Sequence, residues 1–163
     1  MSDVQKLLTT ALAGARKIAV LGCGSPLRGD DAAGFHIAER LSGLHGNARA
    51  FCGSSAPENF TGEIKRFFPD TLLVIDAADI AQPPGTVAII PPENVTGATF
   101  STHMLPLKVM LEYLGRETGC RILLLGIQGA SLEFSTEMTP VVAAAVDTVV
   151  SALLNLLENQ RCD

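Results

Sequence analysis

Residues 71–77 read TLLVIDA, and this stretch decides the expected fold. Its apolar side chains continue without the alternation that is typical of a strand with one face in water. Residues 121–127, RILLLGI, have the same continuous character. A strand that is apolar on both faces is covered on both faces, as in a parallel sheet between two layers of helices. The sequence therefore predicts buried central strands at both places.

Outward from these two stretches, short aliphatic runs alternate with segments of helical period. Further strands are expected at 17–23, 48–52 and 86–90, and helices at 32–44, 58–68, 103–118 and 138–158, after an amphipathic N-terminal helix. This order predicts an α/β fold, a three-layer α/β/α sandwich around a mostly parallel five-stranded sheet. No helix separates 71–77 from 86–90, so one antiparallel edge strand is expected. No linker or repeat divides the chain, and residues 1–163 are expected to form a single domain.

The charge balance argues against nucleic acid as a partner. The 12 Lys and Arg residues against 17 Asp and Glu leave a net charge of −5, and the basic residues form no cluster that could bind a phosphate backbone. No apolar stretch approaches the ~18 residues needed to span a bilayer, and the N-terminal helix lacks a cleavage pattern. We therefore expect a cytoplasmic protein without a membrane partner.

The four cysteines are Cys23, Cys52, Cys120 and Cys162, and no two form a C-x-x-C pair. Their scatter argues against a zinc ribbon or a redox dithiol. The first three lie in apolar stretches, where buried reduced thiols are expected. Cys162 is expected to be exposed because it lies next to the C-terminus.

The loop GCGSPLRGDD, residues 22–31, begins like a phosphate-binding loop and ends differently. Its glycines are spaced G-x-G-x-x-x-x-G, which is the wrong register for a dinucleotide fingerprint, and the second strand does not end in the required acidic residue. In a Walker loop, Lys and Ser or Thr would stand where Asp30 and Asp31 stand. Two carboxylates at a helix N-terminus would repel phosphate, so the loop suits a cation or a shared proton. Alternatively, one of them caps the helix expected from Ala32.

Two other polar residues are expected at the same edge of the sheet. Asp76 closes the run LLVID at the end of a central strand, and His103 stands at the start of an expected helix. Function in such sheets collects at the carboxyl ends of the strands. With one of the loop aspartates, Asp30 or Asp31, these residues would form a mixed oxygen and nitrogen site with open positions, suited to a divalent transition metal, and such a site could also activate water. The alternatives are a cap or loop hydrogen bond for Asp76, with Asp79 the better cap, and a structural role for His103.

Other catalytic patterns are missing from the sequence. His36 lies along a helix and His45 in a loop flanked by glycines, so both are expected to be surface residues. There is no G-x-S-x-G elbow of a serine hydrolase and no H-E-x-x-H helix of a zinc protease. Serine and zinc-protease chemistry are therefore disfavoured.

Five segments, in this order, resemble one known family. They are LGCGSPLRGDD (21–31), SAPEN (55–59), LLVIDAAD (72–79), STHMLPL (101–107) and LLGIQ (124–128). Together they resemble the hydrogenase maturation endopeptidases, and most closely the branch that processes the hydrogenase 3 large subunit of formate hydrogenlyase systems. The resemblance runs from about Lys17 to Leu157. The family fold is a twisted sheet sandwiched by helices, which agrees with the expected architecture.

The resemblance implies an endopeptidase that removes the C-terminal extension of a [NiFe] hydrogenase large-subunit precursor after nickel insertion. Asp31, Asp76 and His103 match the family's metal-contacting and active-site positions. Nickel would arrive with the precursor and be what the protease recognises. Ser25 stands where the family commonly has Asn, and Ala32 where it commonly has Gly. These two departures bear on substrate choice more than on activity.

The implied reaction is hydrolysis of a peptide bond held beside the nickel centre. Either the metal lowers the pKa of the attacking water, or an aspartate removes its proton as a general base, as in an aspartyl protease. One alternative is a non-catalytic nickel-binding or escort protein that uses the same ligands in cofactor assembly. Another is an amidase or peptidase with a small soluble substrate. In each case a monomer that docks transiently is expected.

Overall fold

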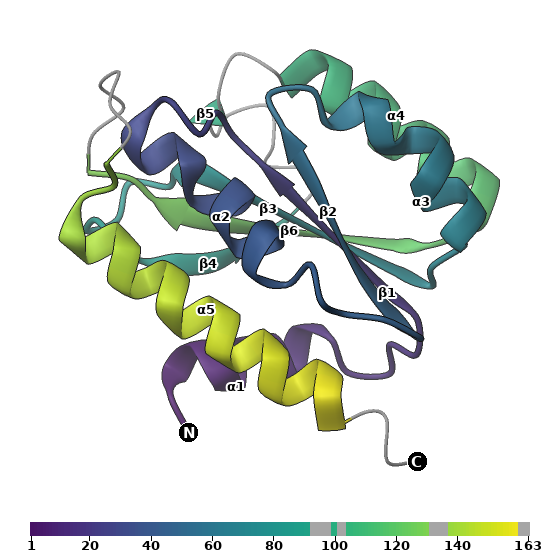
Figure 1. Cartoon of the computed structure of the whole chain (residues 1–163), viewed down its shortest axis with the longest axis horizontal. Coiled ribbons are helices and arrows are strands. Elements are labelled where there is room, and N and C mark those ends of the chain that lie inside the picture. The colour runs from purple at the N-terminus through teal and green to yellow at the C-terminus, as the bar shows by residue number, and fades with distance from the viewer. Residues whose placement is uncertain (92–98, 101–103, 131–136, 160–163) are drawn as a thin grey trace.

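The computed structural model describes residues 1–91, 99–100, 104–130 and 137–159. One twisted sheet runs through the molecule, with helices on both faces (Figure 1). The strands are β1 (Ile18–Cys23), β2 (Ala48–Ser54), β3 (Thr71–Asp79), β4 (Val87–Ile90), β5 (Thr99–Phe100) and β6 (Arg121–Gln128). The helices are α1 (Asp3–Ala11), α2 (Ala33–Arg40), α3 (Thr61–Phe67), α4 (Met104–Thr118) and α5 (Pro140–Asn159), with short 3₁₀ helices η1 (Gly29–Ala32) and η2 (Pro57–Phe60).

The sheet has the strand order β2-β1-β3-β6-β4, and β5 pairs with β3 outside this path. Strands β2, β1, β3 and β6 are parallel to one another, whereas β4 lies antiparallel to β6 at the edge and β5 lies antiparallel to β3. The five expected strands and the antiparallel edge strand are therefore confirmed. The two-residue β5 was not expected, because it is too short to carry a periodic signal.

The two predicted central strands are covered on both faces. In β3, Leu73 and Ile75 belong to one hydrophobic core cluster, together with residues of α1, α2 and α5. Leu72 and Val74 belong to a second cluster, together with residues of α3 and α4. Figure 1 shows these two groups of helices on opposite sides of the sheet. The continuous apolar run is thus explained by two cores, one on each face.

Helix α5 corrects one expectation. By length and composition its 20 residues could cross a membrane, so the statement that no apolar stretch approaches that length is wrong. Its buried residues, including Val142, Val149 and Leu153, pack in the core against the sheet. The core helix of a globular protein passes the same test of hydropathy, and this helix is weak support for membrane insertion.

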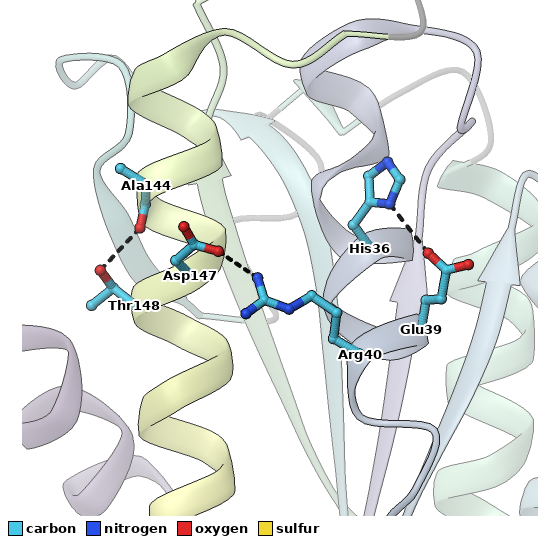
Figure 2. A network of polar contacts seen from close by, with 6 residues as sticks. All are labelled: His36, Glu39, Arg40, Ala144, Asp147 and Thr148. Carbon is cyan, nitrogen blue, oxygen red and sulfur yellow. Dashed lines mark hydrogen bonds and ion pairs between the residues drawn. The ribbon is translucent and has the colours of Figure 1, made fainter.

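Polar contacts join α2 to α5 at the surface. Figure 2 shows Arg40 of α2 forming an ion pair with Asp147 of α5, and His36 bonded to Glu39 one turn along the same helix. The ring of His36 lies 3.4 Å from the Glu39 carboxylate and is partly exposed. His45 is exposed and lies 3.2 Å from the Gly43 carbonyl oxygen. Both histidines therefore make local contacts, as expected for surface residues.

The amino ends of the central strands are held by Asp70, which precedes β3. One of its carboxylate oxygens accepts the backbone N–H of Arg16 at 2.9 Å and that of Lys17 at 2.8 Å. The other accepts the hydroxyl of Thr71 at 2.9 Å. Asp70 is exposed, so this carboxylate has both protein donors and water. It fixes the entry of the chain into β1 and β3 at what we call the amino edge of the sheet.

Candidate functional site

The turn from β1 into η1 folds back on itself at the opposite, carboxyl edge of the sheet. Gly24 has a φ of +115°, and a Cβ placed there would lie 1.7 Å from the backbone oxygen of Asp31 and 3.5 Å from Oδ1 of Asp76. Only glycine combines this φ with so close an approach. The N–H of Ser25 donates to Oδ2 of Asp31 at 2.9 Å. The glycine turn therefore holds Asp31 against the end of β1, next to Asp76.

Helix α2 packs unusually close to the sheet behind this turn. A Cβ at Gly34 would lie 2.1 Å from the backbone oxygen of Ile75 and 2.5 Å from that of Cys23. The first turn of the helix thus contacts the residues that immediately precede Asp76 and Gly24. The sequence places a glycine here because no side chain fits between helix and strands.

Asp76 is a buried carboxyl without full hydrogen bonding. It continues β3 past Ile75, whose Cα pairs with Gly22 of β1, and it is 2% exposed. Among the described residues, its Oδ1 has no hydrogen-bond partner. Burial raises the pKa of Asp76 well above its ordinary value, the charge of Asp31 raises it further, and a hydrogen bond with the backbone of Ala77 opposes the rise. The alternative that loop hydrogen bonds fully account for Asp76 therefore fails at Oδ1.

Asp31 supplies the second carboxylate and is 5% exposed. Its negative charge acts on Asp76, which is also buried. Two buried carboxylates close together are unfavourable unless a proton or a cation compensates their charge. An open oxygen on Asp76 and a fixed carboxylate on Asp31 suit a divalent cation chemically. The pair is therefore a candidate cation site.

Asp30 has a different environment from its neighbour. It is 0% exposed, and its Oδ2 accepts the N–H of Ala130 at 2.8 Å while its Oδ1 accepts the N–H of Thr139 at 2.8 Å. The Thr139 hydroxyl lies 3.0 Å from both oxygens. Neither η1 nor α2 has a side-chain cap. The alternative that one of the two aspartates caps this helix is therefore wrong, because the carboxylates bond to other groups.

His103, the third predicted site residue, lies outside the described residues. The short β5 pairs with the end of β3, with Phe100 opposite Ala78 and Thr99 opposite Asp79. Within the described parts of the chain, no group of three or more His, Cys, Asp and Glu side chains could hold a metal ion. Of the predicted ligands, the structure thus brings Asp31 and Asp76 together, and the place of His103 stays a prediction. Asp79 accepts the N–H of Ala81 at 3.1 Å and serves the turn after β3.

Cys23 was not singled out as part of this region. It ends β1 on the same face as Asp76, and burial raises the pKa of its thiol well above the ordinary value, with further contributions from the charges of Asp76 and Asp31. The thiol is therefore kept neutral beside the acids. Cys23 and Cys120 are free and buried and Cys52 is partly buried, which confirms reduced thiols at these positions. Cys162 lies outside the described residues.

Sequence reasoning also missed the polar contacts of Gln128 at the end of β6. Its Oε1 accepts the N–H of Ile80 at 2.8 Å, and its Nε2 donates to the Gly129 oxygen at 3.1 Å. Gln128 is the last residue of a central strand, and function was already expected at that edge of the sheet. This position is the sequence feature that could have pointed to it.

Comparisons with known proteins agree with this architecture. A family model described as "HycI: Hydrogenase maturation protease" matches residues 36–156. The hydrogenase 3 maturation protease of Escherichia coli K12 is 36% identical over 137 residues, covering 82% of this chain and 87% of its own length. The crystal structure of the [NiFe] hydrogenase maturation protease HycI from Thermococcus kodakarensis KOD1 superposes with a TM-score of 0.82 at 28% identity, covering 96% of this chain and 99% of its own. The hydrogenase maturating endopeptidase HybD of E. coli gives a TM-score of 0.72 at 30% identity, covering 88% and 93% respectively.

Proposed function

The chain belongs to the HycI family of hydrogenase maturation proteases, and from this membership we propose that it is an endopeptidase acting on a [NiFe] hydrogenase large subunit. It removes the C-terminal extension of the large-subunit precursor after nickel has been inserted. The family match covers most of the chain, and the Escherichia coli relative carries the word protease in its name. The chain is accordingly a peptidase, and its substrate is the proposed part.

The observation that carries the proposal is the unsatisfied oxygen of Asp76. A carboxyl that is 2% exposed, has one oxygen without a partner among the described residues and faces a second carboxylate is half of a cation site. A nickel centre presented by the precursor would complete it and offset the cost of burying two acids. His103 is the proposed third contact. Nickel is then part of the substrate and need not stay with the protease.

Hydrolysis at this site needs an activated water and a fixed peptide bond. Asp31 is held in place by the N–H of Ser25, so it is pre-positioned to contact the metal centre of the precursor. Asp76 is the candidate general base, and burial and then the charge of Asp31 raise its pKa above the ordinary value, so its ionised form would be a stronger base toward water than an ordinary carboxylate. Metal-bound water is the other source of the nucleophile. In both versions an empty precursor lacks the contact that brings its peptide bond to the acids, so it is not cleaved.

The proposal is tested by mixing the purified protein with nickel-loaded and nickel-free precursor and weighing the products by intact-mass spectrometry. Shortening of the loaded precursor alone is expected. Equal shortening of the loaded and nickel-free precursors would contradict nickel recognition. If neither precursor is shortened, the escort role is favoured. Cleavage of the loaded precursor by Asp31→Asn at the wild-type rate would remove the proposed site. We further propose a monomer that works in the cytoplasm without nucleic acid or membrane as partners.

A further inference from the structure

Residues 128–130, which are the last residue of β6 and the two that follow it, contact both of the segments that carry the site acids. We propose that Asp30 and Gln128 are positioning residues, which use this end of β6 to hold Asp31 and Asp76 at the separation that the reaction requires. The proposal deepens the proposed function and rests on it for its activity measurements. Neither residue needs to touch the substrate.

The contact on the Asp31 side is made by Asp30. Its two oxygens accept N–H groups from two separate places in the chain, Ala130 just after β6 and Thr139 just before α5. The carbonyl of Thr139 accepts the N–H of Ala143 at 2.9 Å, so Asp30 lies at the N-terminus of α5. A helix N-terminus stabilises a buried carboxylate. Since Asp31 is the next residue along η1, its backbone can shift only if Asp30 also shifts.

The contact on the Asp76 side is made by Gln128. Its Cα pairs with Ala78 of β3, two residues beyond Asp76. Its Oε1 accepts the N–H of Ile80 at 2.8 Å and that of Gln82 at 3.4 Å, so it fixes the chain where it leaves β3. Its backbone oxygen accepts the N–H of Gly85 at 2.8 Å. The side chain of Gln128 therefore holds the exit of β3 against the same strand end that Asp30 contacts.

This arrangement explains why a fully buried aspartate lies beside the site acid without sharing its role. Two carboxylates that bind one cation must hold their separation within about 0.5 Å, and a misplacement of about 1 Å can cost ~100-fold in rate. Asp31 and Asp76 come from segments far apart in sequence. Residues 128–130 connect their segments by hydrogen bonds, in addition to the pairing of β1 with β3 and the Ser25–Asp31 bond.

The first test compares two isosteric changes that each remove a hydroxyl bonded to an aspartate. Thr139→Val removes the hydroxyl that donates to Asp30 at the carboxyl edge, and Thr71→Val removes the hydroxyl that donates to Asp70 at the amino edge. The backbone N–H donors of both aspartates remain. Both substitutions are expected to lower Tm. Only Thr139→Val is expected to lower kcat for the nickel-loaded precursor, by about 10-fold with KM within a factor of about 2. Thr139→Ser, which keeps the hydroxyl, is expected to restore kcat.

The second test addresses the contact that Gln128 makes on the Asp76 side. Gln128→Leu removes the acceptor for the Ile80 N–H and is expected to lower kcat by about 10-fold, whereas Gln128→Glu keeps an acceptor oxygen and is expected to recover most of it. In an Asp31→Asn background, Thr139→Val should cause no further loss, because the residue through which it acts is already missing. Equal kcat losses from Thr139→Val and Thr71→Val, or full additivity with Asp31→Asn, would overturn the proposal.

A readout without catalysis separates this proposal from the proposed function. The Ser25 amide donates to Asp31, so its hydrogen-exchange protection reports whether Asp31 is held in place. Asp30→Asn places an amide donor against a backbone N–H and is expected to reduce this protection by about 10-fold, while Thr71→Val leaves it unchanged. Unchanged protection in Asp30→Asn would overturn the positioning role even if the wild-type protein cleaves no precursor. A wild type that fails to cleave, with protection lost in Asp30→Asn, would instead contradict only the proposed function.

Discussion

The two edges of the sheet treat a carboxylate in opposite ways. At the amino edge, Asp70 is exposed and accepts two backbone N–H groups and a hydroxyl. At the carboxyl edge, Asp76 is 2% exposed, has a partner-free Oδ1 among the described residues and lies near the charge of Asp31. Asp70 immediately precedes β3 and Asp76 lies within it, so the two residues differ mainly in the edge of the sheet at which they lie. The edge therefore determines whether the carboxylate is exposed and hydrogen-bonded or buried with an open oxygen.

The difference separates a carboxylate that holds the fold from one that is available for chemistry. Asp70 has donors that match its oxygens, so its interactions are complete in the folded protein. Asp76 is buried without enough hydrogen-bond donors, which lowers the stability of the folded protein. A bound proton or cation would offset this loss of stability. Sites of this kind are typical of function that is built at the expense of stability.

The largest effect is expected from Asp76→Asn. The change keeps the size of the side chain and removes the charge, so we expect cleavage of the nickel-loaded precursor to fall by about 10² to 10⁴-fold. Asp70→Asn should leave cleavage per folded molecule unchanged. Single-turnover assays with intact-mass detection measure both. A wild-type rate for Asp76→Asn would contradict the proposal that only the carboxyl-edge aspartate takes part in cleavage.

Gly24→Ala tests the geometry of the carboxyl edge. The new Cβ would lie 1.7 Å from the Asp31 oxygen at a φ of +115°, so we expect a loss of about 3 kcal/mol or more in the free energy of unfolding. Gly46, in the turn before β2 at the amino edge, has a φ of +74°, and a Cβ added there would meet nothing within 4 Å. Gly46→Ala should therefore cost only about 1 kcal/mol. Urea denaturation compares them, and similar losses would mean that the Asp31 carbonyl can move away.

The pH dependence of stability should also distinguish the edges. Burial and then Asp31 raise the pKa of Asp76 in the folded protein, so the unfolded chain loses this proton first as pH rises above about 4. The folded state binds more protons in that window, and stability from this group falls as pH rises toward the folded pKa. Asp76→Asn should therefore be more stable than wild type at neutral pH and equal to it near a pH of about 3. A stability difference that is the same at every pH would contradict the raised pKa of Asp76.

The smallest effect is expected from Arg40→Gln, at an exposed side chain at the end of α2. Its ion pair with Asp147 of α5 (Figure 2) joins side chains that are 45% and 70% exposed. Exposed pairs contribute less than about 1 kcal/mol, and salt screens them. We expect a small fall in Tm at low salt, no fall at about 1 M salt and unchanged cleavage. A large, salt-independent loss would mean that the pair orients α5.

Much of the fold could be read from local patterns. The runs at 71–77 and 121–127 were correctly predicted as buried strands, because two-sided burial leaves a continuous apolar signature. The edge strand β4 was expected from the short connection after β3, although it pairs with β6 rather than with β3 itself. Helix ends were predicted less well: α2 was expected to reach residue 44 and ends at Arg40. The chain turns there, although Leu41 and Leu44 stay buried in the core and continue the apolar period.

The candidate site was predicted in part. The rule that parallel strands bring their carboxyl ends to one edge predicted that a loop aspartate lies near Asp76, and the family resemblance singled out Asp31. The structure places Asp31 and Asp76 together at that edge. The roles of Asp30 and Gln128 could not be predicted, because their partners lie in other segments of the chain. Asp30 and Ala130 are 100 positions apart, and no local period or motif encodes such a bond.

The sequence by itself determined the layer architecture, the two-sided burial of the central strands and the identity of the acids that end a turn and a strand. These are consequences of side-chain type and spacing, which act over a few residues. Only the tertiary structure showed why the two adjacent aspartates differ, since it satisfies Asp30 with hydrogen bonds and leaves Asp31 next to Asp76. That difference depends on donors supplied by residues 130 and 139, and a buried charge takes its properties from the groups around it in space.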